Sequence, residues 1–130
     1  MITNACRANS LLRLHVGLFI LLPMMEQITS QIGDFFFSWD EGKSRANNKK
    51  HGVTFHEAAT CWLDSYAREI YDEGHSQNET RWLMVGRSNL DRLLICWYTE
   101  RKIGQQQIVR LIGARITTLK EKEFYYADFK

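Results

Sequence analysis

The stretch WLMVGRSNLDRLLICWYT, residues 82–99, decides the fold of this chain. Two apolar runs rich in aromatic and branched side chains, 82–85 and 93–99, flank the turn-forming segment GRSNLD at 86–91. This arrangement is typical of two neighbouring strands joined by a tight connection. The stretch therefore predicts a β-hairpin.

Further strands are expected on both sides of this hairpin. Residues 107–114 form another apolar run after the polar turn 102–106, and residues 67–71 form a possible strand before the hairpin. An aromatic run at 35–39 is consistent with one more strand. Because the links between consecutive strands are short, the sequence predicts a mainly antiparallel sheet.

Helices are predicted from their capping residues. Asp40 fits an N-cap and Gly52 a left-handed C-cap, which bounds a conspicuously polar helix between them. Thr54 and Glu57 form a capping box before an apolar stripe that reaches Leu63. A second capping box, Thr118 with Glu121, opens a helix that continues through Tyr126. These elements predict an α+β domain with a mainly antiparallel sheet, two N-terminal helices and a C-terminal helix.

The first 34 residues differ from the remainder and are excluded from the fold. The uncharged run Leu14–Met25 is shorter than the roughly 20 residues needed to cross a bilayer. No small-residue cleavage pattern of a secretory signal follows it. We expect residues 1–34 to be a disordered leader or the product of a start site assigned too far upstream, with Met24 or Met25 as the true start. Residues 35–130 are expected to form one domain, and a membrane anchor at Leu11–Met25 is an alternative.

Composition excludes several classes of protein. Hydrophobic residues make up 45% of the chain and charged residues 25%, a globular mixture that excludes a wholly disordered protein. The net charge of +2 is too small to identify a nucleic-acid-binding protein by itself. Cys6, Cys61 and Cys96 are odd in number and widely spaced, which favours reduced thiols in the cytoplasm. No zinc-binding spacing or phosphate-binding glycine loop occurs, so we expect no metal and no cofactor.

Four segments resemble the BrnT family of toxins, in order and with suitable gaps. They are FSWDEGKSRANNKKHGVTF (37–55), ETRWLMVGRS (79–88), LLICWYTER (93–101) and IVRLIGARITT (108–118), followed by the region Glu123–Tyr126. The chain departs from the family pattern where Gly113 replaces an expected Ser and where Trp97–Tyr98 replaces Val-His or Val-Tyr. Gly42, inside the first predicted helix, is a further departure.

The resemblance implies a RelE-like fold and a metal-independent endoribonuclease that acts on cellular RNA in the bacterial cytoplasm. It also implies a partner, a BrnA-like ribbon-helix-helix antitoxin, through which the toxin would contact operator DNA indirectly. No membrane association is expected. The main alternative is a non-catalytic module of the same fold that acts only as an antitoxin-binding corepressor.

Metal-free RNA cleavage needs cations for the phosphate and groups that transfer protons. Within the family-matching segments the catalytic candidates are His51, Lys50, Arg87, Arg115 and Glu79. The RNA-binding candidates are Lys43, Lys49, Arg81 and Arg110. In a regular strand Arg110 and Arg115 would point to opposite sides, and Arg115 is favoured for the cleft because it lies at the strand end.

Proton transfer is assigned to His51, because a histidine side chain can act as an acid or as a base near neutral pH. Its position before a C-cap Gly equally suits a structural role at the helix end. Glu79 is expected either to act as a base or, preferably, to pair with Arg81 two residues later on the same strand face. His56 and His75 are interpreted as exposed.

Overall fold

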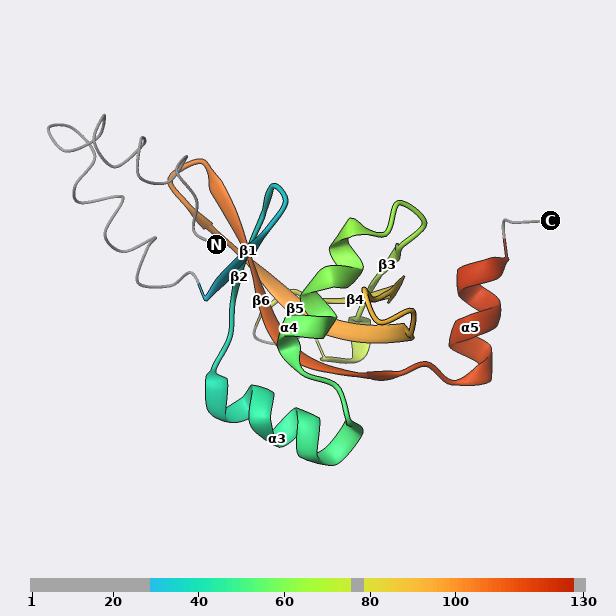
Figure 1. The fold of residues 1–130 in the computed structure, drawn as a ribbon. Helices are drawn as coiled ribbons and strands as arrows, with labels where there is room; N and C mark the ends of the chain where they lie inside the picture. The colour runs from blue at the N-terminus through green and yellow to red at the C-terminus, as the bar shows by residue number, and fades with distance from the viewer. Residues whose placement is uncertain (1–28, 76–78, 128–130) are drawn as a thin grey trace, which may run out of the picture.

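The computed structural model describes residues 29–75 and 79–127, which form one sheet with short helices on both of its faces (Figure 1). In chain order they are β1 (Ser30–Ile32), β2 (Phe35–Ser38), α3 (Glu41–His51), α4 (Phe55–Ala59), the 3-10 helix η1 (Thr60–Leu63), β3 (Arg68–Tyr71), the 3-10 turn η2 (Glu73–His75), β4 (Arg81–Arg87), β5 (Leu93–Ile103), β6 (Gln106–Ile116) and α5 (Leu119–Tyr126). The α+β class is confirmed.

The sheet is mixed, which corrects the prediction of a mainly antiparallel sheet. Its strand order is β1-β2-β6-β5-β4-β3, and β2 runs parallel to β6 whereas the other neighbours are antiparallel. The prediction considered only links between consecutive strands. The parallel pair joins Phe37 to Val109 across the intervening helices and hairpin, a long-range contact that local turn signals do not encode.

The central hairpin is confirmed, with β4 and β5 in register from Arg81–Thr99 to Arg87–Leu93. The N–H of Ser88 donates to the carbonyl of Arg92 at 2.8 Å, and Asp91 adopts a positive φ of 57° in the turn. Residues 30–34, assigned by the sequence to the leader, form β1 and its turn into β2. The start-site hypothesis and the apolar run Leu14–Met25 lie outside the described residues.

A bulge interrupts the pairing of β5 with β6. Trp97 pairs with Gly113 and the next residue, Tyr98, pairs with Leu111, so Ile112 is an extra residue in β6. A single extra residue reverses the side to which every later side chain points. The bulge therefore decides which residues of β6 share a face.

Helix α3 has little apolar surface and lies at the edge of β6. Its buried residues are Ser44 and Asn47, and the side chain of Asp40 caps its first turn at the N–H of Lys43. Strand β2 pairs with β6 only as far as Arg110. Beyond that point the amide of Asn47 takes the place of a neighbouring strand: it donates to Ala114 O at 2.8 Å and accepts from Ala114 N at 3.2 Å.

The predicted continuous helix from Thr54 to Leu63 is wrong in its second half. Helix α4 ends at Ala59, and a 3-10 turn follows. The hydroxyl of Thr60 donates to the carbonyl of Glu57 at 2.6 Å, a local bond that tightens the turn. Leu63, placed in the apolar stripe, is 59% exposed.

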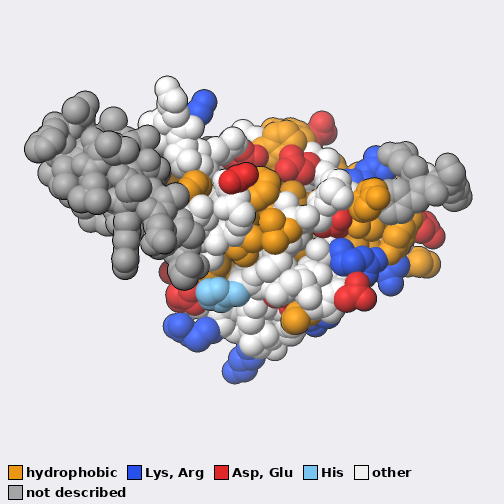
Figure 2. Space-filling model, turned by 45° about the horizontal axis from the view of Figure 1, so that its top comes forward, with side chains coloured by type: hydrophobic (Ala, Val, Ile, Leu, Met, Phe, Trp, Pro, Cys, Tyr) orange, Lys and Arg blue, Asp and Glu red, His pale blue; other side chains and the backbone are white. Residues whose placement is uncertain are grey.

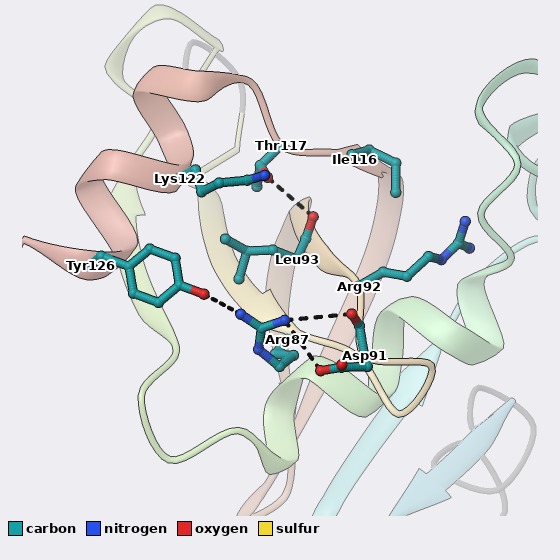
Figure 3. Close-up of a pocket in the computed structure, with 8 residues that line it drawn as sticks. All are labelled: Arg87, Asp91, Arg92, Leu93, Ile116, Thr117, Lys122 and Tyr126. Atoms are coloured by element: carbon teal, nitrogen blue, oxygen red, sulfur yellow. Dashed lines mark hydrogen bonds and ion pairs between the residues drawn. The ribbon is translucent and has the colours of Figure 1, made fainter.

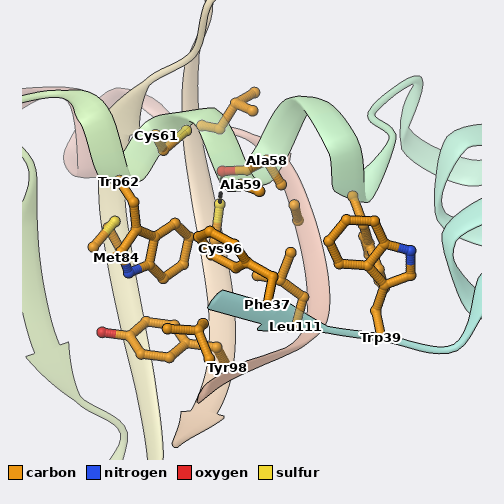
Figure 4. Packing of buried hydrophobic residues seen from close by; sticks show 14 of the residues in the cluster. Phe37, Trp39, Ala58, Ala59, Cys61, Trp62, Met84, Cys96, Tyr98 and Leu111 are labelled. Atoms are coloured by element: carbon orange, nitrogen blue, oxygen red, sulfur yellow. Dashed lines mark hydrogen bonds between the residues drawn. The ribbon is translucent and has the colours of Figure 1, made fainter. Parts of the chain in front are cut away.

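The main core lies between the sheet and the α4–η1 segment (Figure 4). Trp62 packs edge-on against Phe37 and Tyr98, with ring centroids 5.1 and 4.9 Å apart. Cys61 and Cys96 are buried as free thiols in the same cluster and pack there as small apolar side chains. The hydrogen bond to Cys61 and burial raise the pKa of Cys96 well above its usual value.

Helix α5 covers the opposite face of the sheet. Tyr125 packs on Val85, Leu93 and Ile95, with Phe124 and Trp97 at the margin. This second cluster is smaller than the main core, so part of the sheet surface beside α5 stays open. Within the described residues no helix has the length and apolar character needed to cross a membrane.

Candidate active site

At least five arginines share the α5 face of the sheet. Arg68 pairs across strands with Val85, Arg81 and Arg110 both pair with Thr99, Arg87 pairs with Leu93, and Arg115 pairs with Ile95. Directly paired residues point to the same side of a sheet. Because Val85, Leu93 and Ile95 pack under Tyr125, these arginines lie on that same face.

This arrangement corrects one prediction from the sequence. Arg110 and Arg115 were expected on opposite sides because a regular strand alternates. The extra residue Ile112 lies between them and restores both to one face. A regular strand would place Arg110 and Arg115 on opposite faces, so the sequence alone does not predict that both belong to the α5 face.

A cavity of about 390 Å³ opens on this face next to α5. It is lined by Asp72, His75, Arg81, Leu83, Ile95, Trp97, Arg115 and Glu121. We call it the arginine cavity. It combines two guanidinium groups, a histidine, two carboxylates and an indole. It brings together Arg81 and Arg115 from the candidates selected by sequence.

Arg115 is held in a fixed position by Glu121. Two of its guanidinium nitrogens donate to the two carboxylate oxygens of Glu121 at 2.8 and 2.9 Å. Glu121 is itself fixed by the capping box with Thr118, which the sequence predicted. Hydrogen bonding to Arg115 lowers the pKa of Glu121, and hydrogen bonding to Glu121 raises the pKa of Arg115. The start of α5 is thereby tied to the arginine it faces.

His75 lies at the wall of the arginine cavity and pairs with Asp72. Its Nδ1 is 3.2 and 3.1 Å from the two carboxylate oxygens of Asp72. The N–H of Asp72 donates to the carbonyl of Arg81 at 2.9 Å, which joins this pair to β4. The side chain of His75 is 69% exposed, so a ligand can reach it. The interpretation of His75 as a merely solvated side chain missed this pair, although the Asp-x-x-His spacing was a usable signal.

A second hollow of about 470 Å³ lies beside Arg87 and is lined by residues from before α5 to its end, among them Thr117, Lys122 and Tyr126 (Figure 3). The guanidinium of Arg87 is hydrogen-bonded to the Tyr126 hydroxyl and lies 3.2 Å from Asp91. Arg87, a predicted catalytic residue, is thus placed in a different hollow from Arg81 and Arg115.

Asp64 anchors the wall between the sheet and α5. Its carboxylate accepts from the Tyr125 hydroxyl at 2.6 Å and from the N–H of Arg87 at 2.8 Å. Burial raises the pKa of Asp64, but these hydrogen bonds outweigh burial and bring it below its usual value. Burial and the contact with Asp64 raise the pKa of Tyr125 to about 12.

The remaining candidates line neither hollow. Lys43, Lys49, Lys50 and His51 all belong to α3, where the three lysines are exposed and His51 is the last helical residue. Glu79 is exposed just before β4, and Arg110 lies farther along β6. Figure 2 shows charges of both signs scattered over the face in view, with no continuous basic surface. The exposed lysines of α3 thus form a basic segment separate from the two hollows.

No metal centre is indicated by the described part of the chain, which contains no group of three or more His, Cys, Asp or Glu side chains able to hold an ion. The polar groups of the arginine cavity are suited to another task. Guanidinium groups bind phosphate oxygens through several hydrogen bonds, and a histidine supported by a carboxylate can transfer a proton. These groups are of the kind that can bind a phosphodiester, which is the class of ligand that the site suits.

Comparison with known families agrees with this class. The family model described as "Ribonuclease toxin, BrnT, of type II toxin-antitoxin system" matches residues 39–121. This match covers more than half of the chain, and the chain belongs to the BrnT toxin family. The resemblance inferred from the sequence is confirmed.

Among solved structures, the chain is similar to the ribonuclease toxin BrnT of Brucella abortus, known from a 1.1 Å crystal structure. The two are 20% identical, with a TM-score of 0.45, and the alignment covers 62% of this chain and 92% of the other. No curated protein matches the sequence.

Proposed function

We propose that this chain is a metal-independent endoribonuclease that cleaves RNA in the arginine cavity. The observation that carries the proposal is the convergence of Arg81, Arg115 and the His75–Asp72 pair around one cavity. The family assignment supports a ribonuclease toxin. The identity of the reacting groups is our own assignment.

The proposed reaction uses the 2′-hydroxyl of RNA as the nucleophile. Its oxygen attacks the adjacent phosphorus as the hydroxyl proton is removed. The bond from phosphorus to the 5′-oxygen then breaks, and that oxygen gains a proton. The products are a 2′,3′-cyclic phosphate and a 5′-hydroxyl. Arg81 and Arg115 would stabilise the charge that develops on the phosphate oxygens.

His75 is the proposed proton-transfer residue. Asp72 accepts its Nδ1–H and leaves Nε2 for substrate, an arrangement that fixes the orientation of the ring. His51, the residue selected from the sequence, lies at the end of α3 and lines neither hollow. The geometry therefore favours His75 over His51, and mutation of each residue separates the two assignments.

The decisive experiment incubates the full chain with total RNA in excess EDTA, alongside His75→Ala, His51→Ala and Arg115→Ala. We expect cleavage to survive EDTA and to fall by roughly two to four orders of magnitude in His75→Ala. We expect a fall of about a hundredfold in Arg115→Ala. His56→Ala is the matched control, because His56 is exposed and packs against Trp39 away from the cavity. If His51→Ala abolishes cleavage and His75→Ala does not, the assignment to His75 is wrong.

A non-catalytic corepressor is the second candidate, and one observation favours it. Both oxygens of Glu121 already accept hydrogen bonds from Arg115, so phosphate must compete with a bound carboxylate. A folded chain that leaves RNA intact, with and without ribosomes, while it binds an antitoxin would support this alternative.

The proposal includes an antitoxin partner of the BrnA-like, ribbon-helix-helix type in the cytoplasm, with operator DNA contacted through that partner. An acidic or apolar segment of the antitoxin would cover the cations on the α5 face and exclude RNA. Charge pairing of this kind accelerates association more than it tightens the complex. We expect the association rate to fall as salt is raised, and a rate independent of salt would contradict this role for charge.

A further inference from the structure

Trp97 occupies an unusual position in the centre of β5. Its indole fills the space directly above Gly113 on the neighbouring strand. A Cβ added at residue 113 would lie 2.2 Å from Cζ2, 2.3 Å from Cε2 and 2.6 Å from Nε1 of the ring. No side chain fits at position 113 while the ring keeps this place. The glycine therefore permits the indole to lie across two strands.

The indole also borders the arginine cavity. Trp97 is partly exposed and lines that cavity together with Arg81 and Arg115. Among the described residues its ring N–H has no hydrogen-bond partner. Leu83 and Ile95 lie beside it in the cavity wall. The result is an apolar, aromatic surface between two cationic groups.

Trp39, Trp62 and Trp82 have structural roles and provide a comparison for Trp97. Trp39 and Trp62 are 5% and 8% exposed in the main core. Trp82 is partly buried on the other face of the sheet, where its ring packs against Tyr71 at 5.5 Å. Of these rings, Trp97 alone lines the arginine cavity. Packing buries part of the surface of the Trp97 ring, and the exposed part is available to a ligand.

We propose that Trp97 is a stacking platform for a nucleobase of the bound RNA, with the flanking phosphates held by Arg81 and Arg115. This inference rests on the proposed function and adds a base-binding subsite to it. Every nucleobase presents a flat aromatic face, and stacking on an aromatic side chain adds affinity with little sequence preference. Cations beside the ring bind the backbone that carries the base. The subsite therefore selects single-stranded RNA whose base can leave its own stack.

The test uses two short oligonucleotides with 2′-O-methyl riboses, which cannot be cleaved because the nucleophile is blocked. One carries bases and the other is abasic throughout. The full chain is compared with Trp97→Leu, which keeps apolar volume and removes the ring, and with Trp97→Phe, which keeps a ring. Trp82→Leu is the matched control on the opposite face. We expect Trp97→Leu to bind the base-bearing oligonucleotide about tenfold more weakly, with unchanged binding of the abasic one.

A fluorescence measurement covers the case in which Trp97→Leu fails to fold. Stacking of a base on Trp97 should quench tryptophan emission in the wild-type chain and in Trp82→Leu. The quenching should disappear in Trp97→Phe, although this variant still binds. Quenching that persists in Trp97→Phe, or equal losses of affinity for both oligonucleotides in Trp97→Leu, would overturn the platform.

These outcomes are distinct from failure of the proposed function. If the wild-type chain binds neither oligonucleotide, the RNA-binding assignment of the cavity fails and the platform fails with it. If the wild-type chain binds both oligonucleotides equally well, the cavity binds the RNA backbone and only the platform is refuted.

Discussion

The two faces of the sheet are built from different chemistry. The face under α4 and η1 is closed by interlocking aromatic rings, among them Phe37, Trp62 and Tyr98. The face under α5 carries at least five arginines around a smaller apolar cluster. Polar contacts attach α5, including the hydrogen bond from Tyr125 to Asp64 and the ion pair of Arg115 with Glu121. One face thus supplies most of the buried apolar packing, and the other carries the cations of the proposed RNA-binding site.

Truncation of one buried ring gives the largest expected loss of stability. Trp62→Ala removes a side chain that contacts both Phe37 and Tyr98, and we expect the free energy of unfolding to fall by about 4 kcal/mol. Leu83→Ala, on the partly covered α5 face, should cost about 1 kcal/mol because its surface is already partly exposed. Urea unfolding measures both. Equal losses would mean that the two faces do not differ in this way.

The ion pair between Glu57 and Arg92 should have the next largest effect. The Glu57 carboxylate is buried, and it accepts hydrogen bonds from Arg92 and from the Ser88 hydroxyl. Glu57→Gln leaves the guanidinium without its charged partner, and we expect a loss of about 3 kcal/mol in urea unfolding. Glu123→Gln, the same change at an exposed position of α5, is a control that leaves the pair intact. A loss no larger than that of the control would show that the Glu57–Arg92 pair does not stabilise the fold.

The same pair gives stability a defined pH dependence. Burial raises the pKa of Glu57, but hydrogen bonds from Arg92 and Ser88 outweigh burial and lower it below the usual 4.5. A folded-state pKa below the unfolded value stabilises the fold above pH 4.5, and the contribution is lost as the pH falls through the folded-state pKa. Tm measured from pH 7 down to pH 3 should therefore drop below about pH 4.5. The drop should be shallower in Glu57→Gln, and identical curves would contradict the assignment.

Gly113→Ala tests the close contact between residue 113 and the indole of Trp97. The added methyl collides with the Trp97 indole, and overpacking of this kind costs about 2 kcal/mol. Trp97→Leu in the same chain should recover most of that loss, because the smaller side chain leaves room for the methyl. A double-mutant cycle of unfolding free energies checks the coupling. Additive losses would show that the ring moves away without strain.

The smallest effect is expected at the start of α5. Thr118→Ala removes the acceptor for the N–H of Glu121 and should cost about 1 kcal/mol. Thr118→Ser keeps the hydroxyl and should cost less. Thermal unfolding compares the two variants. If both behave as wild type, the capping box contributes nothing to the position of α5.

Much of the fold followed from local signals in the sequence. Asp40, Gly52 and Thr118 bound their helices as predicted, because capping depends on one or two neighbouring residues. The parallel pairing of β2 with β6 did not follow, since it depends on packing between distant segments. The capping box at Thr54 formed only in part. Thr54 caps Glu57, whose carboxylate turns to Arg92 instead of its own helix.

The candidate site was predictable to a smaller extent. Arg81 and Arg115, which line the cavity, were selected from the sequence because they are cations within the segments that resemble the family. It missed His75, whose pairing with Asp72 depends on a short 3-10 turn. Gly113 and Trp97 are direct neighbours in space, and the absence of a side chain at position 113 leaves room for the indole.

The bulge at Ile112 makes the chemistry of the α5 face depend on the length of β6 as well as on its residue identities. Deleting this one residue would return the strand to simple alternation and turn either Arg110 or Arg115 to the opposite face. Replacing Ile112 with another residue would leave both arginines where they are. A single-residue deletion in this strand would therefore separate the two cations without changing either of them.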